Sequence, residues 1–168
     1  MPARNRYRFW RHVATDHRTV RRTFPDSALE RIETAIAAGE RTHRGQLCVA
    51  IESALPAARV LKQLSPRERA LEVFGLLRVW DTEENSGVLV YLLLADRGVE
   101  IVADRGIHRI VGDVAWKAIC ARMEESFHAG NYADGVVTGV AEISGLLAQH
   151  FPRDGAGPNE LSDKPVVL

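Results

Sequence analysis

The sequence has few cysteines and no hydrophobic run long enough to cross a membrane. Its 168 residues include two cysteines, too few for the disulfide framework of a small secreted domain. The longest apolar run covers residues 87–95, whereas a transmembrane helix needs about 20 residues. The arginine-rich start is not followed by the apolar segment of a signal peptide. We therefore expect a soluble, cytoplasmic protein, with a peripheral membrane location as the second expectation.

Common catalytic and metal-binding motifs are missing as well. The sequence contains no phosphate-binding GxxxxGK loop, no GxGxxG dinucleotide motif, no GxSxG nucleophile turn, no HExxH helix and no zinc-type CxxC pair. Cys48 and Cys120 lie within apolar segments, where cysteine behaves as a small buried hydrophobic residue. Neither is expected to act as a nucleophile.

Positive charge is concentrated at the N-terminus, although the net charge of the chain is zero. Residues 1–25 hold seven arginines and one acidic residue, which leaves 15 of the 22 basic and 21 of the 22 acidic residues to the rest. Aromatic and apolar residues recur among these arginines at roughly helical spacing between residues 4 and 22, which predicts a weakly amphipathic basic helix.

Such an arm either binds a partner or folds back on the acidic body. An anionic membrane surface and a protein are the expected partners, and nucleic acid is less favoured because no recognition fold accompanies the arm. The candidate binding residues of the arm are Arg4, Arg6, Arg8, Trp10 and Arg11.

The body of the chain alternates between helical and apolar patterns. Three apolar strands are expected, at residues 46–52, 87–95 and 99–103, and a tight turn closed by Gly98 joins the last two into a hairpin. Capping boxes at Ser27 and Ser65 mark the start of two helices. Two more helices are expected to begin at Asp113 and Asn131.

Helices on both sides of these strands indicate an α/β fold, a three-layer α/β/α sandwich whose small mixed sheet contains a central β-hairpin. The expected divisions are a basic arm at residues 1–25, an α/β/α domain at 26–151 and a disordered tail at 152–168.

Carboxylates gather at the two ends of the hairpin that meet at one edge of the sheet. Because hard cations prefer oxygen ligands, we consider these loops a candidate site for Ca²⁺ or Mg²⁺. The alternative is a set of solvated loop acids, with Asp113 capping its helix. The candidate metal ligands are Asp104, Asp113, Glu83 and Glu84. The candidate ligand- or partner-binding residues nearby are Asp81, Asn85, Arg105, His108 and Arg109.

Three short motifs lie in residues 26–151: Asn-Ser-Gly-Val-Leu at 85–89, Asp-Arg-Gly-Ile-His at 104–108 with an acid at Asp113, and Phe127 followed by Gly-Asn-Tyr at 130–132 and Gly135. They resemble those of the TPM domain family, whose members include a thylakoid-lumen protein of photosystem II repair. Residues 85–89 (Asn-Ser-Gly-Val-Leu) stand where the family has Asp-Asn-Gly-Val-Leu. Residues 104–108 stand where it has Gly-Tyr-Gly-Leu-Glu, followed by an acid at Asp113. Residues 127–135 contain the phenylalanine, the Gly-Asp-Tyr-like triplet (here Gly-Asn-Tyr) and the further glycine of the family.

The resemblance implies an α/β/α sandwich with a groove near these loops, and divalent-cation binding and acid phosphatase activity have been proposed for some members. This sequence has Asn85 in place of a family acid, His108 in place of the glutamate and Asp104 in place of a glycine. We therefore favour a non-catalytic TPM-type binding or accessory module, with a role in envelope or stress maintenance. The alternative is a divalent-metal-dependent, acid-phosphatase-like hydrolase in which Arg105 or Arg109 steadies the phosphate.

Overall fold

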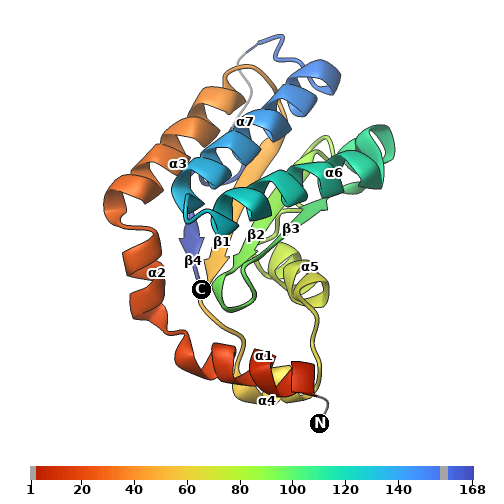
Figure 1. Cartoon of the computed structure of the whole chain (residues 1–168). Coiled ribbons are helices and arrows are strands. Elements are labelled where there is room, and N and C mark those ends of the chain that lie inside the picture. The colour runs from red at the N-terminus through yellow and green to blue at the C-terminus, as the bar shows by residue number, and fades with distance from the viewer. Residues whose placement is uncertain (1–2, 156–158) are drawn as a thin grey trace.

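The computed structural model describes residues 3–155 and 159–168, with side chains described from residue 6 onward. Four strands form one sheet, and helices pack on both of its faces (Figure 1). The strands are β1 (Gln46–Glu52), β2 (Gly87–Leu93), β3 (Gly98–Ala103) and β4 (Val166–Val167). The α-helices are α1 (Ala3–Ala14), α2 (His17–Thr23), α3 (Asp26–Glu40), α4 (Ala57–Leu61), α5 (Pro66–Leu76), α6 (Arg105–His128) and α7 (Tyr132–His150).

The sheet has the order β3-β2-β1-β4 and is mixed. β1 runs parallel to β2 and to β4, and β2 forms an antiparallel hairpin with β3. Every residue of β1 and β2 is buried, as expected for strands that are apolar on both faces. The predicted α/β fold and its central hairpin are confirmed.

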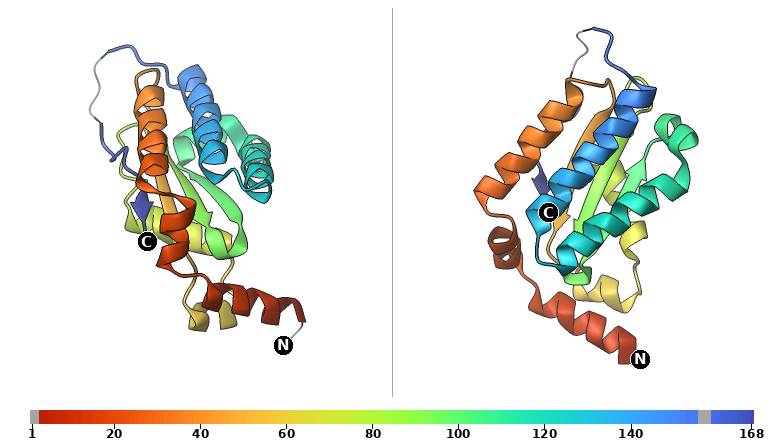
Figure 2. Two further views of the ribbon diagram at one scale, coloured as in Figure 1. Left: turned by 60° about the vertical axis from the view of Figure 1, so that its left-hand side comes forward. Right: turned by 45° about the horizontal axis from the view of Figure 1, so that its top comes forward.

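Two hydrophobic clusters lie on the two faces of the sheet. Leu47, Val49 and Ile51 of β1 join the larger cluster with α3, α6 and α7, while Cys48 and Ala50 join the smaller one with α5. This alternation follows from the two-residue side-chain period of a strand. In Figure 2 the three long helices cover one face, and α5 lies on the other.

Capping chemistry was predicted correctly at one of the two serines. Ser65 precedes α5, its hydroxyl accepts a hydrogen bond from the Glu68 N–H at 3.1 Å, and the Glu68 carboxylate accepts from the Ser65 N–H at 2.8 Å. The capping box predicted at Ser27 is wrong. There Pro25, with φ fixed at −61°, already occupies the cap position, so α3 begins at Asp26.

Two predictions around the hairpin need correction. The tight turn closes on Arg97, which has φ +52°, and not on Gly98. The long helix α6 begins at Arg105, eight residues before the predicted start at Asp113. It begins there because Asp104 accepts the Arg105 N–H at 2.6 Å and because Ile107, in the first turn, is fully buried. Gly112, with φ +76°, marks a kink between two helical segments.

The arm is two helices and not one. Asp16 interrupts it and caps α2 by accepting the Thr19 N–H at 3.0 Å. Val20 and Phe24 then enter the main core, so α2 is tied to the body.

The prediction of a disordered tail does not hold for residues 159–168. β4 pairs with β1 at Ala50 and Ile51, and the Gln46 side-chain carbonyl accepts the N–H groups of Glu160 and Leu161 at 2.9 and 3.0 Å. Local composition predicts disorder because the partners of this segment, such as Gln46 and Glu83, lie far away along the chain. The segment covers the edge of β1 that would otherwise be open.

A buried carboxyl group links this C-terminal segment to α3 and gives the fold a pH dependence. Burial, and then the neighbouring carboxylate of Asp163, raise the pKa of Glu40 to about 7. The stabilisation contributed by protonated Glu40 is complete below its ordinary pKa and is lost as the pH rises through about 7. Glu40→Gln, which keeps the neutral form, should raise the free energy of unfolding near pH 8 by an amount on the order of 2 kcal/mol.

Urea denaturation of both proteins near pH 5 and pH 8 measures this effect. The matched control is Glu30→Gln, at an exposed glutamate of the same helix, which should follow the wild type at both values. A wild-type protein that becomes more stable from pH 5 to pH 8, with Glu40→Gln following it, would contradict the assignment.

Candidate functional site

The loop before β2 and the start of α6 meet at one edge of the sheet, which we call the rim (residues 81–86 and 104–109). The Asp104 N–H donates to the Gly87 carbonyl at 2.8 Å, because the antiparallel register places Val88 opposite Ala103. A Cβ at Gly106 would lie 2.5 Å from the Asn85 carbonyl oxygen and 2.8 Å from that of Glu84. Only glycine permits this approach of the two backbones.

Two carboxylates of the rim pair with arginines, and the backbone of a third acidic residue faces a further carboxylate. Glu84 pairs with Arg44 at 2.7 Å and Asp81 with Arg78 at 2.8 Å. The Glu83 N–H faces both carboxylate oxygens of Glu160 at 3.3 Å. A narrow cleft of about 60 Å³ lies here, lined by Arg44, Gln46, Glu83, Glu84, Ser86, Arg153 and Glu160. Its mixture of charges does not favour an ion of either sign.

Asp104 is the exception among these acids. It is only 8% exposed, its Oδ1 caps α6, and its Oδ2 is buried with no hydrogen-bond partner among the described residues. Asn85 takes the left-handed conformation, with φ +51°, as turn residues often do.

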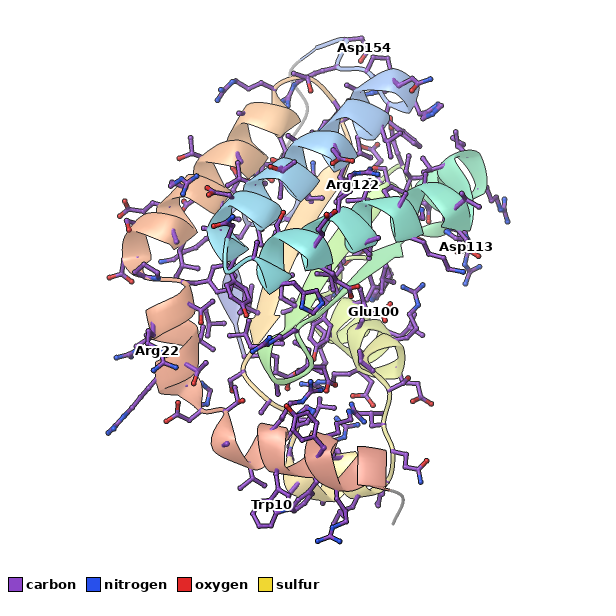
Figure 3. All side chains as sticks on the ribbon, in the orientation of Figure 1. Trp10, Arg22, Glu100, Asp113, Arg122 and Asp154 are labelled. Atoms are coloured by element: carbon purple, nitrogen blue, oxygen red, sulfur yellow. The ribbon has the colours of Figure 1, made fainter. Side chains whose placement is uncertain are left out.

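Asp113 is carried away from the other acids by α6. It lies more than two helical turns beyond Asp104 along the chain and is exposed just after the kink at Gly112 (Figure 3). His108 Nε2 lies 3.8 Å from the Asp113 Oδ1. Arg105 and Arg109 are exposed on the same segment.

The four predicted metal ligands therefore do not form a complete ligand set. Within residues 3–155 and 159–168 no group of three or more histidines, cysteines, aspartates or glutamates is placed to hold a metal ion. Ca²⁺ and Mg²⁺ take six or more oxygen ligands, some of which are water, and among the four predicted ligands Asp104 offers a buried oxygen without a hydrogen-bond partner. The protein groups at the rim therefore supply only part of a coordination sphere.

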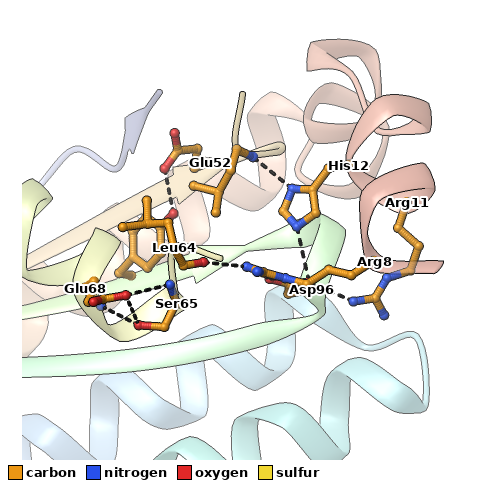
Figure 4. Close-up of polar contacts among 10 residues, drawn as sticks. Arg8, Arg11, His12, Glu52, Leu64, Ser65, Glu68 and Asp96 are labelled. Carbon is orange, nitrogen blue, oxygen red and sulfur yellow. Dashed lines mark hydrogen bonds and ion pairs between the residues drawn. The ribbon is translucent and has the colours of Figure 1, made fainter. Parts of the chain in front are cut away.

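The basic arm is held on the body by one buried carboxylate at the opposite end of the hairpin (Figure 4). Two arginines form ion pairs with the Asp96 carboxylate. Arg8 Nη2 lies 2.8 Å from Oδ2, and Arg11 Nη2 lies 2.7 Å from Oδ1. His12 Nε2 lies 3.2 Å from Oδ1. We call these four residues the Asp96 clamp. Arg8 also donates to the Leu64 carbonyl at 3.0 Å.

The histidine of the clamp orders the backbone as well. His12 is buried, and its Nδ1 accepts the Leu55 N–H at 2.9 Å, which leaves the ring proton on Nε2, facing Asp96. Burial alone raises the pKa of Asp96, but the contacts with His12 and Arg8 outweigh it and hold that pKa well below its usual range. Asp96 therefore stays ionised at any physiological pH.

The outer side of α1 carries exposed aromatic residues. Tyr7, Trp10 and Val13 stand three residues apart on one stripe and are 69%, 62% and 53% exposed. Trp10 points away from the body in Figure 3. Arg6 is exposed beside this stripe, and the side chain of Arg4 lies outside the described part.

Sequence reasoning missed the residues that orient the arm. His12 and Asp96 were not singled out, although the one signal available, the spacing of Arg8 and His12, places both on the same helical face. Nothing local connects this face to an aspartate more than 80 residues away. Consequently Arg8 and Arg11 fix the arm on the body, while the side chains of Trp10 and Arg6 are exposed and can contact a partner.

The fold and these two regions define an α/β/α domain with a loop rim at one end of its hairpin and a docked helical arm at the other. The sequence model of the TPM domain matches residues 20–146, and the chain belongs to the TPM domain family. Within the described residues no helix has the length and hydropathy needed to cross a membrane.

Solved structures support the same fold. The chain is similar to the BA42 protein of the psychrophilic bacterium Bizionia argentinensis, with 26% identity and a TM-score of 0.75 over 84% of this chain and 93% of that one. It also resembles in fold the N-terminal domain of a protein from P. gingivalis, with 21% identity and a TM-score of 0.55 over 73% and 76% of the two chains. Among curated proteins none matches this chain.

Breaking the clamp should release the arm. Asp96→Asn leaves Arg8 and Arg11 without a counter-charge in a site whose carboxylate is 9% exposed, and breaking a buried ion pair costs about 3 kcal/mol. We expect faster tryptic cleavage after Arg8 and Arg11 of the released helix α1 and a lower Tm. The matched control is Asp134→Asn, which removes the exposed pair with Arg31 and should cost less than about 1 kcal/mol. Equal effects of the two substitutions would contradict the role of the clamp.

Proposed function

We propose that this protein is a non-catalytic TPM-type binding module that engages its partner through the outer face of the arm. The observation that carries the proposal is the division of the arm into two faces. The inner face, with Arg8, Arg11 and His12, is fixed on Asp96. The outer face presents Tyr7 and Trp10 to solvent, where large aromatic residues commonly mark an interaction site.

Unpaired positive charge accompanies these aromatic residues. Arg6, Arg21 and Arg22 are exposed, and no ion pair or hydrogen bond of their side chains occurs among the described residues. Arg22 points outward from α2 in Figure 3. This arrangement favours an anionic partner.

The two cysteines do not support a function in nucleophilic catalysis. Burial is the main cause that raises the pKa of Cys48 to about 11 and that of Cys120 to about 12. Both are therefore thiols at neutral pH, and the thiolate is the nucleophilic form.

Chromatography on immobilised heparin, used as a general polyanion, tests the proposal. We expect retention of the wild type and its elution at elevated salt. The triple variant Arg6→Glu, Arg21→Glu, Arg22→Glu should elute near the void volume, because each lost phosphate- or sulfate-type contact reduces the salt-dependent affinity.

A charge-matched control separates the arm from net charge. Arg41→Glu, Lys117→Glu, Lys164→Glu reverses three exposed cations outside the arm and should elute with the wild type. Equal loss of retention in both triple variants, or no retention of the wild type, would overturn the proposal.

The alternative is a divalent-metal-dependent phosphomonoester hydrolase at the rim. The observation that favours it is the buried, unpartnered Oδ2 of Asp104 beside the converging loops. Since the remaining acids do not complete a ligand set, we derive no catalytic step from it.

Cation titration tests this alternative. If it holds, Ca²⁺ or Mg²⁺ at 100 times its Kd raises the free energy of unfolding by about 2.7 kcal/mol and supports hydrolysis of p-nitrophenyl phosphate. Asp104→Asn should abolish both effects and keep the fold, because asparagine also caps helices. The exposed Asp81→Asn serves as control. Turnover without metal, or turnover that survives Asp104→Asn, would exclude this assignment.

A further inference from the structure

The outer face of α1 continues onto α4, which lies beside it at the same end of the molecule (Figure 2). α4 exposes Leu61, which is 49% accessible, and Lys62. The aromatic stripe of α1, Arg6, Leu61 and Lys62 together make up what we call the basal face. It combines apolar side chains with cations on two adjacent helices.

The basal face and the adjoining helix α2 carry almost no negative charge. Residues 3–25 and 56–64 contain a single carboxylate, Asp16, and its side chain accepts hydrogen bonds from Thr19. Of the other acids near this region, Asp96 lies under Arg8 and Arg11 and Glu72 pairs with Arg59. Glu68, which lines a hollow with Lys62, accepts hydrogen bonds from Ser65. The cations that remain unpaired among the described residues of this region, Arg6, Arg21, Arg22 and Lys62, therefore act on an external partner with little internal compensation.

The arrangement of these groups suits a bilayer better than a shaped partner. The cations are spread along three helices, and a laterally uniform anionic surface needs no matched pattern of charges. Tyr7 and Trp10 have the amphipathic rings that prefer the boundary between headgroups and acyl chains. Because the Asp96 clamp already fixes α1, docking requires little additional ordering of the backbone.

We propose that the basal face docks flat on an anionic lipid bilayer, with Trp10 and Tyr7 at the headgroup–acyl boundary and Arg6, Arg21, Arg22 and Lys62 on the headgroups. This inference rests on the proposed function and names its partner. The rim, at the other end of the hairpin, then faces away from the membrane.

Co-sedimentation with vesicles tests the inference on the full chain. Wild-type protein should bind vesicles of phosphatidylserine and phosphatidylcholine and should not bind vesicles of phosphatidylcholine alone. Each arginine near an anionic surface contributes about fivefold in affinity, so Arg6→Glu, Arg21→Glu, Arg22→Glu should weaken binding about 100-fold. The triple variant at Arg41, Lys117 and Lys164 is the charge-matched control and should bind as the wild type does.

The contribution of Trp10 to vesicle binding is measured separately. Trp10→Ala should weaken binding about tenfold through the lost burial of an indole ring, whereas Trp80→Ala, at a half-exposed tryptophan outside the basal face, should not. Trp116 is buried, so in a protein that carries Trp80→Phe the exposed tryptophan is Trp10. A blue shift of the tryptophan fluorescence on adding anionic vesicles therefore reports the insertion of Trp10. Circular dichroism of each variant confirms folding.

The heparin and vesicle results together distinguish a failure of the lipid assignment from a failure of the proposed function. Retention on heparin that depends on the arm, without binding to anionic vesicles, would overturn the lipid assignment alone and leave an acidic protein or a nucleic acid as the partner. Vesicle binding with no fluorescence shift and no effect of Trp10→Ala would overturn the insertion of the aromatic stripe. Failure on heparin and on vesicles would overturn both proposals.

Discussion

The buried carboxylate of Asp96 determines which part of the arm faces the body and which part faces solvent. It lies in the turn of the β2–β3 hairpin and pairs with Arg8 and Arg11 at 2.8 and 2.7 Å. Removing two arginines and an aspartate from water is unfavourable by itself, so such a cluster persists where every partner is in place. His12 completes it by accepting the Leu55 N–H. With these groups on the inside, helical geometry places Trp10 and Val13 on the outside. Tyr7 lies at the border between the two faces, one turn before Arg11, whose guanidinium lies 5.4 Å from the centre of its ring.

The hairpin separates the two regions that sequence reasoning considered for function. Its turn, at Asp96, supports the arm, and its other end joins Gly87 to Asp104 at the rim. A strand of seven residues spans about 23 Å, so β2, with that length, keeps the regions well apart. The acids of the rim and the Asp96 clamp accordingly make their contacts with separate sets of residues.

Features encoded by neighbouring residues were predictable from sequence. The strand at 46–52 follows from its apolar run, and the start of α5 follows from Ser65, Pro66 and Glu68, which satisfy each other within one turn. The meeting of the loops at the rim follows from antiparallel pairing of two adjacent strands.

Features that depend on distant partners were not predictable in the same way. β4 carries little signal of its own and is defined by pairing with Ala50 and Ile51. Asp113 seemed the better helix cap because it follows a glycine, yet Asp104 takes that role once Ile107 is buried under the sheet. The same limit applies to the candidate site. The sequence identified a basic arm, but the identity of its exposed face depends on His12 and Asp96, whose contact only the folded chain creates.

The depressed pKa of Asp96 bears on how the arm behaves at a charged surface. An anionic bilayer attracts all the arginines of the arm, including those of the clamp, and would pull Arg8 and Arg11 outward if their partner were exposed and screened. The Asp96 side chain is instead only 9% exposed and is held ionised by its contacts with His12 and Arg8, so its attraction for both arginines is little weakened by salt or by surface acidity. Docking on an anionic surface then recruits only the cations outside the clamp, and α1 keeps its orientation on the body. An arm held by exposed ion pairs would lack this property, because competing headgroups would replace its partners one by one.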